Sequence, residues 1–539
     1  MSRLFACLLP LLTLCSSVLA QGPEYIVPLN VEVLGTPAPG YFFLTPFNLD
    51  SAGDYASGLL MLDSAGTPLV YEPNTLESVP QFTRQRWADL TLQPNGDLTL
   101  FYRLPDGRDV LSIRNNSLVQ TDTVVCGQSL DVDAHEAILE PNGTMHLFCL
   151  EERIMDASAI LTNTGLPGSD SCVVLGNNIQ RLDASGNVLW QWHSLDHFDL
   201  TDTYSEYFMN PANLDHTHVN SLEIDADGNY LMSSRHLNEV TKINSTTGDV
   251  MWRMGGKQNE FTLVGDTTWF TGMHDARRLP NGNISLFDNA TTTPNGVARA
   301  IEYEVDEVNM TATVVWQRAL ASGHSSRFIG NAQRMANGNT VINWGGALPL
   351  NETLTMEEVD STGNTVLRMD MDGNFISYRI RKFELPFALP QPDLWCMGWQ
   401  VGTNTTGDAY RWNTGETTQS ITMPDTGSYY VWTQQGDAWF RSESLHLTDT
   451  AGCPTVSSPT IAAPAADWLV FPNPATWELT VSSANAPIEQ VQLHDVTGQQ
   501  LPIPVVRQQA QRARLDVSTV PAGVYFLTVN GSTRQVVIE

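Results

Sequence analysis

Three histidines stand at nearly the same position in three separate repeats of the chain. His135 and His274 each lie seven residues before an Asn-Gly turn, and His218 lies nine residues before an Asp-Gly turn. Near neutral pH an imidazole can act as a nucleophile, as an acid or base, or as a zinc ligand. Repeats that surround a common channel would bring the three side chains together. The spacing alone favours a metal site and an acid–base site equally.

The alternative is that each histidine is structural. A single buried histidine is more often occupied by hydrogen bonds within the fold than by chemistry. Three of the eleven histidines at one repeat position are hard to explain in that way. We therefore treat His135, His218 and His274 as candidate site residues.

Hairpins are the elements that must position these histidines. Asn-Gly and Asp-Gly supply the positive φ angles that two-residue turns need, and the flanking residues alternate between apolar and polar. One kind of hairpin occurs at residues 90–100, 137–147, 222–231, 278–286 and 334–342. A second kind, often ending in Trp, occurs at residues 60–70, 181–190, 242–252 and 367–376.

Two hairpins make a four-stranded antiparallel sheet, and such sheets in series are typical of a β-propeller. Successive turns of the first kind lie 47, 85, 54 and 56 residues apart. We predict an all-β fold with a six-bladed β-propeller over residues 21–386. The longest step leaves room for an insertion near residues 193–215.

The chain beyond the propeller divides into two smaller parts. Short alternating strands over residues 387–462, flanked by Cys396 and Cys453, predict an immunoglobulin-like β-sandwich with a disulfide bond. An Ala/Pro-rich linker then opens the last segment, residues 463–539, which we expect to be a separate small β-sandwich.

The N-terminus has the pattern of an export signal. Arg3 precedes a short apolar run, and a small-residue cleavage site ends at Ala20, so residues 1–20 are predicted to be a signal peptide. No later stretch reaches the roughly 20 apolar residues of a membrane span. Five cysteines remain after cleavage, none in a CxxC pair. We expect disulfides and one free thiol.

Composition limits the class of partner. The 539 residues include 28 basic and 59 acidic side chains, for a net charge of −31. Nucleic acids and anionic membranes are bound through basic patches, so neither is an expected partner. With 42% hydrophobic and only 16% charged residues, the chain is neither a coiled coil nor a charge-rich disordered protein.

The C-terminal segment resembles a known sorting domain. Its motifs are, in order, Phe471-Pro-Asn-Pro-Ala, Val491-Gln-Leu-His-Asp-Val-Thr-Gly-Gln and Leu515-Asp-Val-Ser-Thr-Val-Pro-Ala-Gly-Val-Tyr-Phe-Leu. This is similar to the type A sorting domain of the type IX secretion system. The resemblance implies that the type IX machinery is a partner, and that the protein is secreted or held at the cell surface.

Residues 40–385 resemble the arylsulfotransferase family. The motifs are His218-Val-Asn-Ser-Leu, Ser233-Ser-Arg-His-Leu-Asn, Trp252-Arg-Met-Gly-Gly-Lys, Met273-His-Asp-Ala-Arg, Leu279-Pro-Asn-Gly-Asn and Asn343-Trp-Gly-Gly. The resemblance implies a six-bladed propeller that moves a sulfuryl group from a phenolic sulfate to a phenol. It further implies a sulfated histidine intermediate, no nucleotide sulfate donor, no metal and no cofactor.

By this resemblance four residues are catalytic. His274 fits the nucleophile through its His-Asp-Ala context. His218 and Arg235 fit the second histidine and the arginine, which would stabilise the charge on the transferred group. His135 fits the first histidine and would exchange a proton with the phenol. We expect the side chain of Asp275 to point away from His274, so that another residue orients the nucleophile.

One part of the pattern departs from the family. Gly330 and Asn331 stand in the sixth blade where a histidine is expected, and His324 and Arg327 lie just before them. Arg327, His324 and Asn331 are therefore candidate substrate-binding residues. The alternative function is a secreted, non-catalytic propeller that acts in binding or adhesion, which would not need an intact catalytic set.

Overall fold

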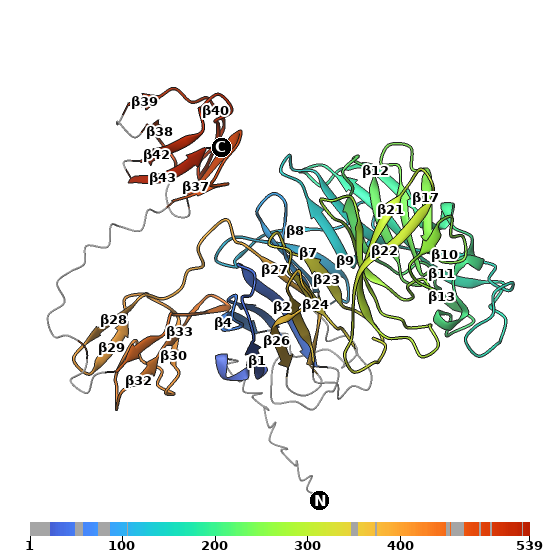
Figure 1. Cartoon of the computed structure of the whole chain (residues 1–539), viewed down its shortest axis with the longest axis horizontal. Helices are drawn as coiled ribbons and strands as arrows, with labels where there is room; N and C mark the ends of the chain where they lie inside the picture. The colour runs from blue at the N-terminus through green and yellow to red at the C-terminus, as the bar shows by residue number, and fades with distance from the viewer. Residues whose placement is uncertain are drawn as a thin grey trace, which may run out of the picture.

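The computed structural model describes residues 22–48, 58–73, 87–104, 106–346, 354–371, 375–448, 453, 468–483, 487–495, 499–530 and 532–538 (Figure 1). The predicted signal peptide and the Ala/Pro linker lie outside these residues. The all-β fold predicted from the repeats is confirmed. In the described part of the chain, no helix is long and apolar enough to cross a membrane.

In the described residues up to Phe383, the strands of the propeller form six mainly antiparallel sheets. The first joins β27 (Phe375–Phe383), β2 (Tyr41–Asn48), β3 (Gly58–Leu62) and β4 (Pro68–Pro73). The second contains β5 (Trp87–Leu92), β6 (Leu98–Arg103), β7 (Asp109–Arg114) and β8 (Gln120–Val124). The third contains β9 (Asp131–Leu139), β10 (Met145–Met155), β11 (Cys172–Leu182) and β12 (Val188–His193), with β13 (Asn213–Asp215) parallel to β11.

The remaining three sheets follow the same plan. The fourth contains β14 (Val219–Ile224), β15 (Tyr230–Ser234), β16 (Glu239–Ile243) and β17 (Val250–Gly255). The fifth contains β19 (His274–Arg278), β20 (Ile284–Asp288), β21 (Arg299–Asp306) and β22 (Thr311–Ala319), with β18 (Thr262–Val264) parallel to β22. The sixth contains β23 (Asn331–Arg334), β24 (Thr340–Asn343), β25 (Met356–Val359), β26 (Thr365–Met371) and β1 (Leu29–Val33).

One strand of each sheet lies at the centre of a ring. Strands β27, β5, β9, β14, β19 and β23 contact one another in that order, and β23 contacts β27 again. The ring is closed by strands from opposite ends of the propeller, because β2 pairs with β27 from Tyr41 opposite Phe383 to Asn48 opposite Phe375. The central strands therefore carry the side chains that meet in the channel.

Apolar side chains hold neighbouring sheets together. Between the fourth and fifth sheets, Leu231, Met254, Phe270, Leu286 and Tyr303 are buried to 1% exposure or less. Alternation along each strand directs these residues between the sheets and leaves the turns outside. At the predicted turns, Gly96 and Gly143 adopt φ angles of 87° and 89°, which glycine permits at little cost.

The predicted insertion lies between the third and fourth sheets. It contains α1 (Ser194–His197), η3 (Leu200–Asp202), η4 (Ser205–Tyr207) and β13. The Lys257 ammonium holds it to the fourth sheet by donating to the carbonyls of Thr201 and Thr203, 2.8 and 2.7 Å away. This packing places η4 and β13 beside the channel mouth.

The segment after the propeller is joined to it by backbone hydrogen bonds. Strands β30 (Ala409–Trp412), β33 (Val431–Gln435) and β34 (Ala438–Arg441) continue the first sheet, since Phe440 pairs with Val70 and Trp439 with Tyr71. Two further sheets contain β28 (Leu394–Met397), β29 (Gln400–Thr403) and β31 (Ser420–Thr422), and β32 (Gly427–Tyr429) with β35 (Leu445–Leu447). The immunoglobulin-like classification stays a prediction, and the segment shares a sheet with the propeller.

The C-terminal domain has two sheets and a core of its own (Figure 1). One contains β36 (Trp468–Phe471), β37 (Glu478–Ser483), β41 (Arg512–Asp516) and β40 (Val505–Gln509). The other contains β39 (Gln500–Leu501), β38 (Val491–His494), β42 (Gly523–Val529) and β43 (Ser532–Ile538). Leu479, Leu493, Leu515, Leu527 and Val536 are fully buried between them.

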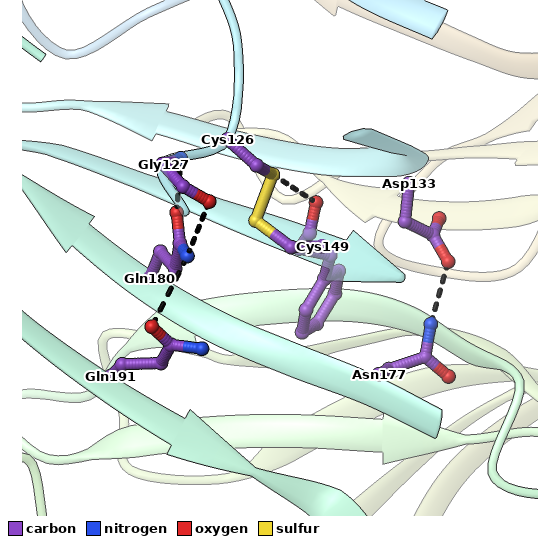
Figure 2. The surroundings of a disulfide bond; sticks show 8 residues. Cys126, Gly127, Asp133, Cys149, Asn177, Gln180 and Gln191 are labelled. Atoms are coloured by element: carbon purple, nitrogen blue, oxygen red, sulfur yellow. Dashed lines mark hydrogen bonds between the residues drawn. A yellow bond between two sulfur atoms is a disulfide. The ribbon is translucent and has the colours of Figure 1, made fainter. Parts of the chain in front are cut away.

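Two disulfides join the described cysteines. The predicted Cys396–Cys453 bond is confirmed, and a second joins Cys126 to Cys149 (Figure 2). Cys172 is free and buried, as the odd count predicts. Figure 2 shows the Cys126–Cys149 bond, which joins the connection between β8 and β9 to the middle of β10, and the hydrogen bond between Asp133 and Asn177 of the same sheet.

Candidate active site

The central strands are irregular where they enter the channel. In β5, β14 and β19 the pairing register shifts beside a residue with positive φ, namely Asp89 (54°), His218 (46°) and Asp275 (57°). Such bulges interrupt the regular alternation of side chains between the two faces of a strand, and so change the direction in which a side chain points. At β19, where the register shifts, the two successive residues have different partners: His274 bonds to Asn289, whereas Asp275 pairs with arginines.

His135 and His218 are each backed by a carboxylate. The Nδ1 of His135 lies in short contact with the Asp133 carboxylate, two residues earlier on β9. The Nδ1 of His218 lies 2.6 Å from Oδ2 of Asp215, at the end of β13. The two imidazoles meet edge to face, with ring centroids 5.1 Å apart. Each Nδ1 therefore donates to a carboxylate, which leaves each Nε2 to face the channel.

His274 is backed by an amide instead. Its Nδ1 lies 2.7 Å from Oδ1 of Asn289, and the side-chain NH2 of Asn289 donates to the Ile329 carbonyl at 2.8 Å. The Ile329 amide in turn donates to Nε2 of His274 at 3.2 Å. This network fixes the neutral tautomer with the proton on Nδ1, so Nε2 carries the lone pair. Asn289 thus orients His274, and Asp275 does not.

The pKa values of His274 and His135 are shifted in opposite directions by their surroundings. Burial and the Arg235 guanidinium hold the pKa of His274 well below its ordinary value, which keeps the imidazole neutral. Burial opposes the charged form of His135 as well, but the Asp133 carboxylate outweighs it and raises the pKa of His135. The pKa of Asp215 is lowered despite its burial, because the imidazole of His218 stabilises the carboxylate.

Arg235 reaches the same site from the turn after β15. Its amide donates to the His218 carbonyl at 3.0 Å, which ties the two residues together across the hairpin. Its guanidinium lies 4.8 Å above the ring of Tyr207, a residue of η4. The charges of Arg235, His218 and His135 all act on His274. The structure therefore brings the four predicted catalytic residues together.

The three weaker candidates lie in different surroundings. Arg327 is exposed, and its carbonyl accepts from Nη2 of Arg235 at 3.0 Å. His324 is exposed, and its carbonyl accepts from the amide of Ala298. Asn331 is buried, and both ends of its side-chain amide bond to the backbone of Ile380 on β27. Asn331 thus joins the sixth sheet to the first, and its substrate-binding role stays a prediction.

A cluster of paired charges fills the channel beside the histidines. Asp275 bonds to Arg277 at 2.7 Å and to Arg381 at 3.0 Å, and Arg379 bonds to Asp89 at 2.8 Å. Arg379 also donates to the carbonyl of His135 at 3.0 Å. Each of these charges has a partner of opposite sign, so none of the named side chains is an uncompensated ion beside the histidines.

A cavity of about 320 Å³ opens beside His135 and His218. Aromatic and aliphatic side chains on one side of it come from the second and third sheets: Phe101, Tyr102, Leu150 and Leu175. Tyr378 of β27 completes the wall, with its ring centroid 5.6 Å from that of His135. The cavity therefore offers an apolar face for a ring and polar groups for its substituent.

Asp215, His218 and His236 are close enough to hold a metal ion, with ligand atoms within 4.8 Å of one another. His236, however, offers no free lone pair in this arrangement. Nδ1 of His236 bonds to the Asp215 carbonyl, and its Nε2 accepts from Arg235. A cationic guanidinium 2.9 Å from a ligand atom also repels a metal cation.

Sequence reasoning missed the residues that act behind the histidines. Asp133 was detectable, because it stands two residues before His135 on one strand and so shares its face. His236 lies inside the quoted motif that begins at Ser233, and Asp215 lies three residues before His218, but neither had a role of its own in the sequence pattern. Asn289 faces His274 only because β19 pairs with β20, where His274 lies opposite Phe287.

Two family models match separate parts of the chain. The arylsulfotransferase (ASST) family model matches residues 106–379, and the secretion system C-terminal sorting domain model matches residues 469–539. No curated protein matches the sequence.

Several solved structures are similar in outline. A protein of unknown function from Bacteroides caccae is 12% identical, with a TM-score of 0.39, over 64% of this chain and 98% of its own. A protein from Lactobacillus plantarum is 11% identical, with a TM-score of 0.33, over 78% and 98%. TM-scores and identities this low support no inference about function.

Proposed function

Because this chain belongs to the arylsulfotransferase family, we propose that it moves a sulfuryl group from a phenolic sulfate ester to a phenol through a sulfohistidine on His274. The reaction is of the ping-pong type and uses no nucleotide donor, metal or cofactor. The sorting domain indicates export, with secretion or cell-surface localisation. A donor that is itself an aryl sulfate suits an enzyme outside the cytosol.

The contrast between the partners of His274 and His135 supports the proposal most directly. His274 is backed by the amide of Asn289 and stays neutral, as a nucleophile must. His135 is backed by the carboxylate of Asp133, which favours its charged form, as a proton donor requires. One site therefore contains an imidazole suited to attack and another suited to proton transfer.

In the first half-reaction, Nε2 of His274 attacks sulfur as the bond from sulfur to the phenolic oxygen breaks. The nitrogen–sulfur bond forms, Nδ1 keeps its proton, and the departing phenolate takes a proton from the His135 imidazolium. Charge on the three sulfuryl oxygens is stabilised by the Arg235 guanidinium and by His218. The amide of Ile329 already points at Nε2 and becomes available to these oxygens.

The second half-reaction reverses these steps with a different phenol. His135, now neutral, takes the proton of the acceptor hydroxyl while its oxygen attacks sulfur. The nitrogen–sulfur bond breaks, and His274 returns to its neutral form with the proton on Nδ1. Both imidazoles thus end each cycle in their starting protonation states.

Mass spectrometry of the protein mixed with 4-nitrophenyl sulfate alone tests the proposal. Quenching in alkali, where an N-sulfoimidazole survives, should give one added sulfuryl group on the peptide that contains His274, together with one equivalent of nitrophenolate. His274→Asn should give neither, and should lose turnover by several orders of magnitude. Turnover without an adduct would contradict the covalent mechanism. No turnover with any aryl sulfate would favour the binding protein.

A further inference from the structure

A fourth histidine, His236, belongs to this site although no role has been assigned to it. It follows Arg235 directly and is only 5% exposed. Its ring is stacked between two others, 4.5 Å from Tyr207 at 15° and 4.5 Å from His218 at 25°. Its amide donates to the Thr217 carbonyl at 3.1 Å, so the backbone is fixed as well.

The hydrogen bonds of His236 define its tautomer. Nδ1 lies 2.7 Å from the main-chain carbonyl of Asp215, and a carbonyl can only accept. Nδ1 therefore carries the proton, and Nε2 is an acceptor. Nη1 of Arg235 donates to that Nε2 at 2.9 Å. A neutral imidazole thus serves as a fixed acceptor for a guanidinium.

Few other contacts orient this guanidinium. Nη2 of Arg235 donates to the Arg327 carbonyl at 3.0 Å, and Cζ of Arg235 lies over the ring of Tyr207, 4.8 Å from its centroid. The buried Nε of Arg235 has no hydrogen-bond partner among the residues that the structure describes. His236, the Arg327 carbonyl and the Tyr207 ring therefore orient the Arg235 guanidinium, while its Nε donor is left available to another group.

We propose that His236 is a positioning residue that holds the Arg235 guanidinium in the orientation that receives the sulfuryl oxygens of the substrate. This inference rests on the proposed function. Its physical basis is that a guanidinium binds an oxyanion through donors in one plane, so its orientation matters as much as its charge. Burial and the neighbouring His218 lower the pKa of His236 to about 3, so it stays an acceptor when the site binds an anion.

A double-mutant cycle with Arg235 separates positioning from a merely structural role. His236→Phe keeps a ring between Tyr207 and His218 but removes the acceptor, and should lower kcat/KM for 4-nitrophenyl sulfate about 10- to 100-fold. In the Arg235→Ala background the same change should cost about twofold or less, because there is no guanidinium left to position. Equal losses in the two backgrounds, or no loss in the single variant, would overturn the inference.

Two further variants keep the result interpretable. His236→Gln offers an amide oxygen to Arg235 and should recover part of the activity that His236→Phe loses. Guanidinium ion at millimolar concentration should restore some activity to Arg235→Ala but not to the double variant. His146→Phe is the matched control, because His146 is buried with hydrogen bonds to Tyr230 and Glu140 outside the site.

Binding of inorganic sulfate, measured by calorimetry in the same variants, distinguishes the two possible failures. If the wild type releases no nitrophenolate, the proposed function fails, and the sulfate affinities still test the positioning. The positioning role is supported if His236→Phe lowers the affinity for sulfate in the wild-type background but not in the Arg235→Ala background. Additive losses, or unchanged affinity in the single variant, overturn it.

Discussion

Imidazoles with different partners behind them lie within one small site, and their proton affinities follow from those partners. The amide oxygen of Asn289 accepts a hydrogen bond from His274 without adding charge, whereas Asp133 adds a full negative charge beside His135. A carboxylate within hydrogen-bond distance commonly raises an imidazole pKa by one or more units. Exchanging an amide and a carboxylate at these two positions is therefore the sharpest change that the site allows.

Asn289→Asp should raise the pKa of His274 and protonate the nucleophile at neutral pH. We expect the rate of nitrophenolate release in a single turnover to fall about 10- to 1000-fold at pH 7, and to recover as pH rises through the new pKa. Asn289→Ala is the control: it loses orientation without adding charge, so its loss should not recover with pH. A loss in Asn289→Asp that does not depend on pH would contradict this role of Asn289.

Asp133→Asn should move the pH dependence of the donor half-reaction. His135 must be protonated to serve the departing phenolate, and its raised pKa keeps it so to higher pH. The rate of sulfuryl uptake should therefore be flat at mildly acidic pH and fall as pH rises through that pKa. Without the carboxylate the falling limb should shift to lower pH by about one unit or more. An unshifted limb would mean that His135 is not the proton donor.

Among the elements, the hairpins were the part of the fold most accessible to sequence reasoning. Each Asn-Gly or Asp-Gly turn constrains four or more neighbouring residues, so the strand pairs at residues 90–100 and 222–231 were predictable in place and type. The four catalytic candidates were accessible for a similar reason, because each lies in a local motif.

The partners of these candidates depend on long-range register. Asp215 comes from the insertion, and Asn289 reaches His274 across a strand pair whose register shifts at a bulge. Neither the position that the insertion takes in the fold nor the bulge in β19 can be predicted from a pattern in a single sequence. The same holds for the pairing of β34 with β4, which is about 370 residues away along the chain and which no local pattern encodes.

The Cys126–Cys149 bond should stabilise the third sheet without taking part in catalysis. It links residues 23 apart, and a loop of that size contributes about 3 kcal/mol in the chain-entropy model. Cys126→Ala/Cys149→Ala should therefore lower the Tm by several degrees while kcat at low temperature stays within about twofold of the wild type. Cys172→Ala is the control, since Cys172 forms no disulfide. An unchanged Tm would contradict this prediction.

At the scale of the whole molecule, the C-terminal domain and the segment before it should differ in their effect on stability. The C-terminal domain has its own core, whereas β34 covers the edge of β4, where Val70 and Phe440 are fully buried. A chain ending at residue 466 should stay folded and active but should not be exported from its native host. A chain ending at residue 386 should lose several degrees in Tm, because it exposes that edge. Normal export of the chain ending at 466 would contradict the sorting role.

Net charge should also affect the approach of the donor. A chain with a net charge of −31 repels an anionic aryl sulfate. Added salt screens this repulsion and shortens the distance over which it acts. We expect kcat/KM for 4-nitrophenyl sulfate to rise about two- to fivefold between low and physiological ionic strength, with kcat unchanged. The KM for a neutral phenol is the internal control and should stay constant. A fall with salt would mean that the local field of Arg235 dominates the encounter.

Ring closure by β2 and β27 also sets when this protein can first become active during its synthesis. Thr45 and Ser377, which bond across that junction, are 332 residues apart, and a ribosome needs about 15 to 70 s to add them. Until then the first sheet lacks its central strand, and the site lacks Tyr378. The order of strands along the chain thus makes the closed ring, and with it the candidate site, one of the last parts of the propeller to be completed during synthesis.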